Sequence, residues 1–414
     1  MTASPLHALD NHLVSAMLEY GGKKFAEEFL DEAEALDSHP EMTMQFAAPW
    51  LVYHASMRGR PVVDWFLEER GWSLSSGERD WLSAQRKSWL SVWEVRAVEP
   101  GLALTLRDLL TFEERRVHEV SASRTLQEHY ALLGRVVDAD GASVICGMHP
   151  IPLRPRSAAS VIERVRKVLR RKTAVSPERL RDPRILWRML DAWSDEIDHA
   201  RTPPRLQNTD GDELLLTEDR WIFDPAMRSE LLTRMASIDG AHAEEPDDPQ
   251  VFTFLRAGNR MHKEWDTTVV GRAELGDGVL RVETNSIARA DALRERIEKV
   301  CAGRIRQHIR SHSDPVALLD RKSTSPPAPV SRRRTPEENA MVREMKDRHY
   351  AAWLNDPIPA LDGKTPREAA RTKSGREKLD ALLKDLEITE AHEPESARFN
   401  VRRLREALGL ARGK

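Results

Sequence analysis

The sequence predicts a multidomain α+β protein. A chain of 414 residues is expected to hold more than one domain, at roughly 100–200 residues each. The apolar period changes from about 3.6 to 2 near Trp89, which marks a passage from helices to strands. Asp-Gly and Gly-Asp-Gly turns separate the alternating runs. We therefore expect a helical N-terminal region, a small antiparallel β-barrel, a basic helix, a second α+β sandwich and a C-terminal helical module.

These expectations divide the chain into six parts. The predicted boundaries are 1–88 for a helical Trp-rich region, 89–155 for the barrel, 156–200 for a basic helical segment, 205–318 for the second α+β domain, 319–334 for a linker and 335–414 for the C-terminal module. The linker is predicted because "DRKSTSPPAPVSRRRTPEE" is rich in Ser, Pro and Arg and has no apolar period.

The N-terminal region carries helical spacing and many aromatic residues. In "HLVSAMLEYGGKKFAEEFLDEAEAL" the apolar residues recur at threes and fours. Six of the eleven tryptophans lie between residues 50 and 93. Because each indole buries a large area, this clustering predicts a helical core. A stacking platform for bases is the alternative interpretation.

The next 65 residues or so alternate as strands do. "SVWEVRAVEPG" and "LALTLRD" place apolar residues at every second position, and further short runs follow after polar breaks. About five short strands favour an SH3-like or OB-like barrel. Such barrels bind nucleic acids, peptides or neither, so this prediction does not settle a function.

A local positive charge follows the barrel. Between Arg154 and Leu190 there are twelve Lys and Arg against three Asp and Glu, although the whole chain has a net charge of −3. In "SAASVIERVRKVLRRK" one helix face is apolar and the other is basic. Binding to nucleic-acid phosphates is therefore a possible function of this helix. The candidate contacts are Arg164, Lys167, Arg170, Arg171 and Lys172. A solvated face, or pairing with the acidic segment "EEFLDEAEA", would explain the same charges.

The second α+β domain contains a clear hairpin, "TTVVGRAELGDGVLRVETNS", followed by a helix that Ser286 should cap. His308 and His312 could hold a metal ion if "RQHIRSH" were helical, but a strand is also possible there. "NTDGDE", from Asn208, resembles a calcium loop only weakly, because it lacks the closing Glu, and a turn is the preferred interpretation.

Signatures of catalysis are missing from the sequence. It contains no Gly-rich phosphate loop, no G-x-S-x-G elbow and no H-E-x-x-H motif. Cys146 and Cys301 stand among apolar neighbours, as reduced and buried thiols do. We favour a protein that is not an enzyme, with no cofactor and no metal site. An enzyme is the alternative, because a catalytic triad is a spatial arrangement that leaves no fixed pattern in the sequence. No run approaches roughly 20 apolar residues and the N-terminus lacks the pattern of a signal peptide, so we expect a cytoplasmic protein without a membrane partner.

The stretch "WLNDPIPALDGKTPREAA", from Trp353, has the composition of a stiff apolar turn. Thr365 is expected to cap a helix that begins at Pro366, where the missing N–H costs nothing. Gly363 can take a positive φ that Asp362 would resist. Prolines stiffen the loop, so a partner would bind with a smaller loss of entropy.

Residues His349–Glu387 resemble the toxin-binding domain of the MbcA/ParS/Xre antitoxins. The matching positions are Trp353, Leu354, Pro357, Pro359, Leu361, Gly363, Thr365, Pro366 and Gly375. This resemblance covers about a tenth of the chain and implies a protein partner, for which a toxin is the candidate. The remainder is similar to uncharacterised bacterial proteins that often carry a SEC-C zinc motif, but the Cys-rich motif is absent here, so no zinc is implied.

Two functions follow as hypotheses. In the first, the chain is a bacterial interaction or regulatory protein whose C-terminal module docks a protein partner, related to toxin–antitoxin systems. The partner would contact Trp353, Leu354, Pro357, Pro359, Leu361, Gly363, Thr365 and Pro366. The apolar members of this set could instead pack mainly against the module's own helix, "REKLDALLKDL". In the second function, the barrel and the basic helix at 157–172 bind nucleic acid.

Overall fold

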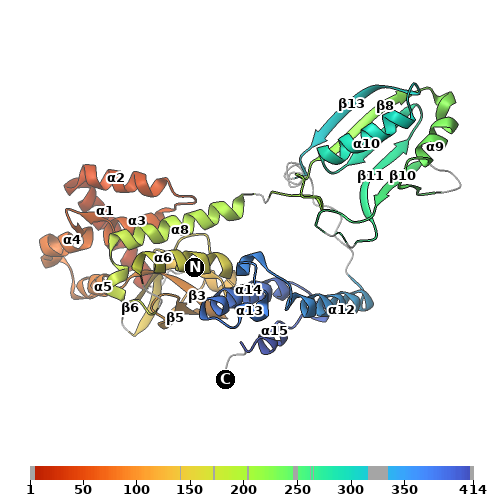
Figure 1. Ribbon diagram of the computed structural model, residues 1–414. Helices are drawn as coiled ribbons and strands as arrows, with labels where there is room; N and C mark the ends of the chain where they lie inside the picture. Colours follow the sequence, from red (N-terminus) through yellow and green to blue (C-terminus); the bar gives the residue numbers. More distant parts are fainter. Residues whose placement is uncertain are drawn as a thin grey trace. The chain divides into compact units, whose positions relative to one another are not determined.

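The computed structural model describes residues 5–139, 141–170, 173–202, 205–245, 250–261, 263, 265–315 and 334–410. The chain divides into two compact units (Figure 1). The first combines Met1–Arg201 with Arg333–Lys414, and the second is Thr202–Arg332. The C-terminal module therefore belongs to the same unit as the N-terminal helices and the barrel. The predicted linker lies outside the described residues, apart from Arg334.

The first unit begins with helices, as the apolar spacing predicts. They are α1 (Pro5–Lys24), α2 (Ala26–Asp37), α3 (Met44–Tyr53), α4 (Val62–Arg70) and α5 (Ser76–Lys87), with the short strands β1 (Ser56–Met57) and β2 (Arg60–Pro61) before α4. Trp50 and Trp81 are fully buried in the core of this region, which confirms the interpretation of the tryptophan cluster as packing. Trp72 is the exception, with 80% of its surface exposed.

Five strands form the predicted barrel. They are β3 (Leu90–Glu99), β4 (Ala103–Asp108), β5 (Glu114–His118), β6 (Ala131–Ala139) and β7 (Ala142–Cys146). The barrel closes in the order β3-β4-β5-β7-β6. All the pairings are antiparallel except β5 with β7, which run parallel at Val117 and Ser143. The barrel is therefore mixed and not purely antiparallel as predicted, because five strands in a closed ring cannot alternate in direction all the way round.

A buried polar cluster joins the N-terminal helices to the barrel. Asp10 of α1 accepts hydrogen bonds from Tyr53, Trp81 and Gln85 through one carboxylate oxygen, at 2.8–3.0 Å. Arg135 of β6 is 1% exposed and donates to the Gln85 carbonyl at 2.7 Å. Its guanidinium also lies 4.2 Å from the centre of the Tyr53 ring. Buried polar groups are tolerated when they find such partners, so this cluster is a structural connection between the two parts.

Three helices follow the barrel: α6 (Pro155–Leu169), α7 (Pro177–Leu180) and α8 (Pro183–Arg201). The apolar face of α6 is buried in the same core as the N-terminal helices. The described helices include none that is both long and apolar enough to cross a membrane.

The second unit is a six-stranded antiparallel sheet with helices on one face (Figure 1). Its elements are β8 (Leu216–Phe223), α9 (Arg228–Ala236), β9 (Ala241–Ala243), β10 (Val251–Arg256), β11 (Thr268–Leu275), β12 (Val279–Thr284), α10 (Ile287–Val300) and β13 (Ile305–Ser313). The strand order is β13-β8-β12-β11-β10-β9. Trp221, Leu293 and Ile297 are among the residues of its own apolar core. Ser286 caps α10 as predicted, since its Oγ accepts the Arg289 N–H at 3.2 Å.

Histidines of β13 do not form the metal clip considered from the sequence. His308 and His312 stand on a strand, where His308 contacts Asp219 at 2.7 Å and His312 contacts Thr217 at 3.2 Å. No group of metal-binding side chains is found among the described residues. The "NTDGDE" segment is a turn, in which the Asn208 side chain accepts the backbone N–H groups of Asp210 and Asp212.

The C-terminal module is helical. It consists of α12 (Pro336–Trp353), α13 (Pro366–Ala369), α14 (Lys373–Ala391) and α15 (Arg402–Ala407). Short 3-10 turns lie at Pro359–Leu361 and Glu395–Ala397. Its apolar residues form a separate core, in which Leu354 and Leu361 pack with Leu379 and Leu383. The predicted α+β, multidomain class is thus confirmed.

Candidate functional site

The stiff turn between α12 and α13 has the conformation that its sequence requires. Ile358 and Lys364 form an isolated bridge across it, and Gly363 has a φ of +74°. Asp362 also adopts a left-handed conformation, with a φ of +60°, contrary to the prediction. Aspartate tolerates this region better than most residues, and here its carboxylate also pairs with Lys378 at 2.9 Å. Thr365 caps α13 as predicted, accepting the Glu368 N–H at 3.2 Å.

The predicted partner-binding residues fall into three groups by burial. Leu354, Leu361 and Pro366 are buried, Trp353 and Thr365 are half-buried, and Pro357, Pro359 and Gly363 are exposed. The two leucines belong to the core of the module, and Trp353 packs against that core from its edge. A partner could therefore touch Pro357, Pro359, Gly363 and part of the Trp353 indole, whereas the two leucines and Pro366 support the turn from inside.

Helix α12 presents an apolar stripe that leads to this turn. Met341 and Met345 are 71% and 58% exposed, and Ala352 is exposed too. Their spacing of four and seven residues places the three side chains on one helix face. Flexible methionine side chains are common at surfaces that bind other proteins. The stripe, defined as Met341, Met345 and Ala352, was not recognised in the sequence because α12 is polar on average.

Charged side chains join α14 to the barrel. Lys384 Nζ lies 2.6 Å from a carboxylate oxygen of Glu94 on β3, and Glu387 Oε2 lies 2.9 Å from His129 Nε2. Arg405 of α15 supports Glu387 from the module side at 2.7 Å. Next to this group, Arg154 contacts Asp385 at 2.9 Å. We call this set of contacts the α14 seam.

Electrostatics of the α14 seam favour the ionised forms. Burial by itself raises the pKa of Glu94, but the contacts with His129 and Lys384 outweigh burial and lower it to about 2. Burial likewise opposes ionisation of Glu387, yet His129 and Arg405 lower its pKa to about 2. For His129 burial alone lowers the pKa, but the carboxylates of Glu387 and Glu94 raise it overall. The seam is an alternating set of opposite charges with little water around it.

The basic helix α6 is largely neutralised by its own chain. Arg164 pairs with Asp195 of α8 at 2.6 Å, and Lys167 pairs with Glu163 one turn earlier at 3.0 Å. Arg170 ends the helix in a left-handed conformation and is exposed. Two of the five candidate phosphate contacts, Arg171 and Lys172, lie outside the described residues. The described acidic partners of residues 154–190 are Asp182, which precedes α8, and residues of α8, α6 itself and α14, and none belongs to the acidic helix α2.

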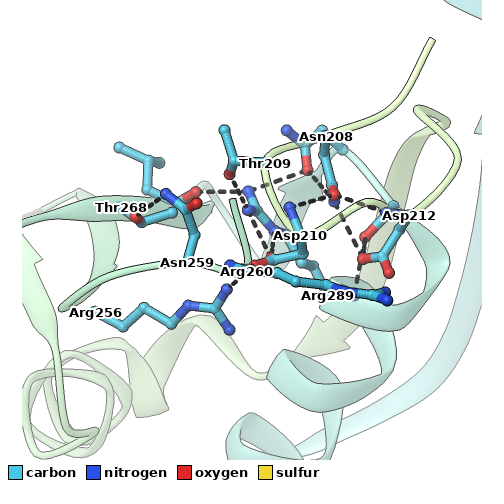
Figure 2. A network of polar contacts seen from close by, with 12 residues as sticks. Asn208, Thr209, Asp210, Asp212, Arg256, Asn259, Arg260, Thr268 and Arg289 are labelled. Atoms are coloured by element: carbon cyan, nitrogen blue, oxygen red, sulfur yellow. Dashed lines mark hydrogen bonds and ion pairs between the residues drawn. The ribbon is translucent and has the colours of Figure 1, made fainter. Parts of the chain in front are cut away.

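A second cluster of polar residues lies in the second unit, around Asp210 (Figure 2). The Asp210 carboxylate contacts the buried Arg289 of α10 at 2.7 Å and also pairs with Arg256 at the end of β10. The backbone N–H of Arg260 donates to it at 3.3 Å. Burial alone raises the pKa of Asp210, but the hydrogen bond from Arg289, the Arg260 N–H and the nearby arginine charges lower it overall.

Beside Asp210 is an open hollow of about 450 Å³. It is lined by Asp210 and by the loop after β10, namely Arg256, Ala257, Gly258, Asn259, Arg260 and Lys263. This volume lies within the range of small-molecule sites. The hollow was not predicted from the sequence. Two features of the sequence could have indicated it. One is the pattern Arg-x-Gly-Asn-Arg in "LRAGNR", where arginines flank a glycine, and the other is an arginine in the first turn of α10.

Comparison with known families gives one result for the first unit. Residues 15–179 match the profile of a protein family of unknown function, DUF7986. The matched segment contains the barrel, α6 and most of the N-terminal helices. The search of curated proteins finds no match.

Proposed function

We propose that this chain is a non-enzymatic interaction protein of bacterial type whose C-terminal helical module docks a protein partner. The observation that carries the proposal is the apolar stripe of α12, which leads to a turn already held in shape by Gly363 and the capping Thr365. Such a surface binds with little loss of conformational entropy. The resemblance to the MbcA/ParS/Xre toxin-binding domain supports a partner of the toxin class.

The contacts of α14 indicate which surfaces of the C-terminal module are available to a partner. One side of α14 packs into the core of the module through Leu379 and Leu383, and another is held by the α14 seam. These faces are occupied within the first unit. The stripe and the outer side of the turn are therefore the apolar surfaces of the module that remain for a partner.

A double variant, Met341→Glu with Met345→Glu, tests the proposal. Both side chains are exposed, so we expect the fold to persist and the affinity for the partner to fall at least tenfold, since a buried methionine is worth about 1.5–3 kcal/mol. Ala340→Glu with Arg343→Glu is the matched control, because both positions are exposed and lie away from the stripe on the same helix. Partners recovered by affinity purification with mass spectrometry would then be titrated in purified form. Unchanged affinity of the methionine variant would contradict the proposal.

Trp353→Ala is a less selective test. The indole packs against the core of the module, so its truncation should reduce both binding and the stability of the module. A loss of binding in this variant is therefore informative only together with the methionine variant.

Nucleic-acid binding by the barrel and α6 is the alternative proposal, and the structure supports it less. Arg164 and Lys167 already pair with carboxylates, which compete with phosphates for these side chains. A salt-sensitive gel shift that charge reversal at Arg164, Lys167 and Arg170 abolishes would favour this alternative over protein docking.

A further inference from the structure

The hollow beside Asp210 combines an open shape with an excess of positive charge. Arg256, Arg260 and Lys263 line it with exposed cationic side chains, and Asp210 is its acidic lining residue. The carboxylate of Asp210 is already engaged by Arg289 and Arg256. The described lining residues therefore keep a net positive charge.

Tertiary contacts hold the walls of this hollow in place before any ligand binds. Arg289 is 5% exposed and donates to Asp210, to Thr209 Oγ1 at 2.9 Å and to the Val269 carbonyl at 2.8 Å. Across the loop, the buried Asn259 side chain donates to Thr268 Oγ1 at 3.0 Å. These contacts fix the turn at Thr209 and Asp210 on one side of the hollow and the loop at Asn259 on the other. A site that is already fixed loses less entropy when a ligand binds.

Gly258 allows the loop to close tightly on itself. It has a φ of +60°, and a Cβ atom at this position would lie 2.7 Å from the Lys263 carbonyl oxygen. Its N–H donates to the Trp265 carbonyl at 2.7 Å. This hydrogen bond holds Gly258 close to Trp265, and Arg260 and Lys263, which lie between them in the sequence, both line the hollow.

We infer that this hollow binds a small molecule that carries a phosphate group. Arginine presents a planar fork of N–H donors that matches phosphate oxygens, and lysine adds a compact charge. Arg260 and Lys263 would contact the phosphate directly, with the outer edge of Arg256 beside them. A cationic ligand is disfavoured, because the Asp210 oxygens already accept from arginine and backbone donors. This site is independent of the docking proposed for the C-terminal module.

The test is a calorimetric titration of the full chain with three probes: inorganic phosphate, adenosine 5′-monophosphate and a single-stranded oligonucleotide. We expect one molecule of either small probe, inorganic phosphate or the mononucleotide, to bind per chain. Arg260→Gln with Lys263→Gln should weaken that binding at least tenfold. Both side chains are exposed, so the melting temperature of the variant should stay the same. Arg272→Gln is the control, an exposed arginine of the same unit that pairs with Glu244 on the sheet.

Several results would overturn the inference. No heat of binding from either small probe at millimolar concentration would do so, and so would mononucleotide binding that survives the double substitution unchanged. Binding of the oligonucleotide alone would replace the small molecule by a nucleic-acid backbone. If the double variant and the Arg272→Gln control lost affinity equally, the binding would reflect the overall positive charge of the unit and not a specific site.

Discussion

At the residue scale, two glycines of the C-terminal module are required for different structural reasons. Gly363 needs its positive φ, but a Cβ atom there would meet no other atom within 4 Å. At Gly375, in the first turn of α14, the constraint is steric and not conformational. A Cβ atom there would lie 2.1 Å from the Ala369 carbonyl oxygen, which ends α13. The close approach of α13 and α14 thus depends on a missing side chain, which gives a physical reason for a glycine at this position.

Substitution of these glycines by alanine should separate the two effects. Gly363→Ala should cost about 1 kcal/mol, the strain of a left-handed alanine. Gly375→Ala should cost clearly more, about 2–4 kcal/mol, because backbone atoms must move apart. Urea unfolding of each variant, followed by the signal of the C-terminal module, measures the difference. If both variants lost the same free energy of unfolding, the backbones of α13 and α14 would not be in close contact at Gly375.

At the element scale, α14 serves two neighbours at once. Its leucines fill the core of the module, and its charged residues form the α14 seam with the barrel. Domain interfaces of this polar kind are held more weakly than apolar ones and respond to salt and pH. The module is therefore attached to the barrel by charge, whereas its own fold depends on apolar burial.

The α14 seam should be strongest at mildly acidic pH. Ionised Glu94 and Glu387 stabilise it above their ordinary pKa of 4.5, and this contribution is lost only as the pH falls towards about 2. Protonated His129 stabilises it fully below the ordinary value of 6.5, and this contribution is lost as the pH rises through its raised pKa. Amide exchange of α14, corrected for intrinsic rates, should thus be slowest between about pH 4.5 and 6.5.

Two variants sharpen this measurement. His129→Gln should remove the loss of protection at alkaline pH, because no titrating ring remains between Glu94 and Glu387. His118→Gln is the control, since this exposed histidine lies on the same barrel at the end of β5. An α14 exchange rate that is equally pH-dependent in the His129 variant would disprove the role assigned to His129.

At the scale of the whole molecule, the second unit is inserted into the sequence of the first. The first unit takes residues from both sides of the insertion, and each unit has an apolar core of its own. A segment with a separate core and an all-antiparallel sheet satisfies its backbone and buries its apolar residues without the rest.

We therefore expect residues 202–332 to fold when expressed alone. The fragment should unfold cooperatively when followed by the fluorescence of the buried Trp221 and the part-exposed Trp265. Calorimetry of the full chain should show a transition at the same temperature. A matched comparison is the fragment 1–201, which lacks the α14 side of the seam and should be less stable than the first unit in the full chain. A fragment 202–332 without a cooperative transition would contradict this division.

The sequence predicted those features that depend on local spacing. Period-2 and period-3.6 patterns were sufficient for the barrel strands and for the buried tryptophans of the N-terminal region. Local chemistry was also sufficient for the caps at Ser286 and Thr365 and for the turn at Gly363. These features involve residues within a few positions of each other, so the local amino-acid sequence is sufficient to predict them.

Contacts between distant segments could not be obtained in this way. Asp210 and Arg289, or Glu94 and Lys384, come together only because sheet order and helix packing bring remote segments close. The sequence showed an excess of basic residues around α6 but not the carboxylates of α8 and α14 that neutralise part of it. Local periodicity thus determined the secondary structure of this protein, whereas the partners of each charge were decided by the fold, because electrostatic energy depends on distances in space.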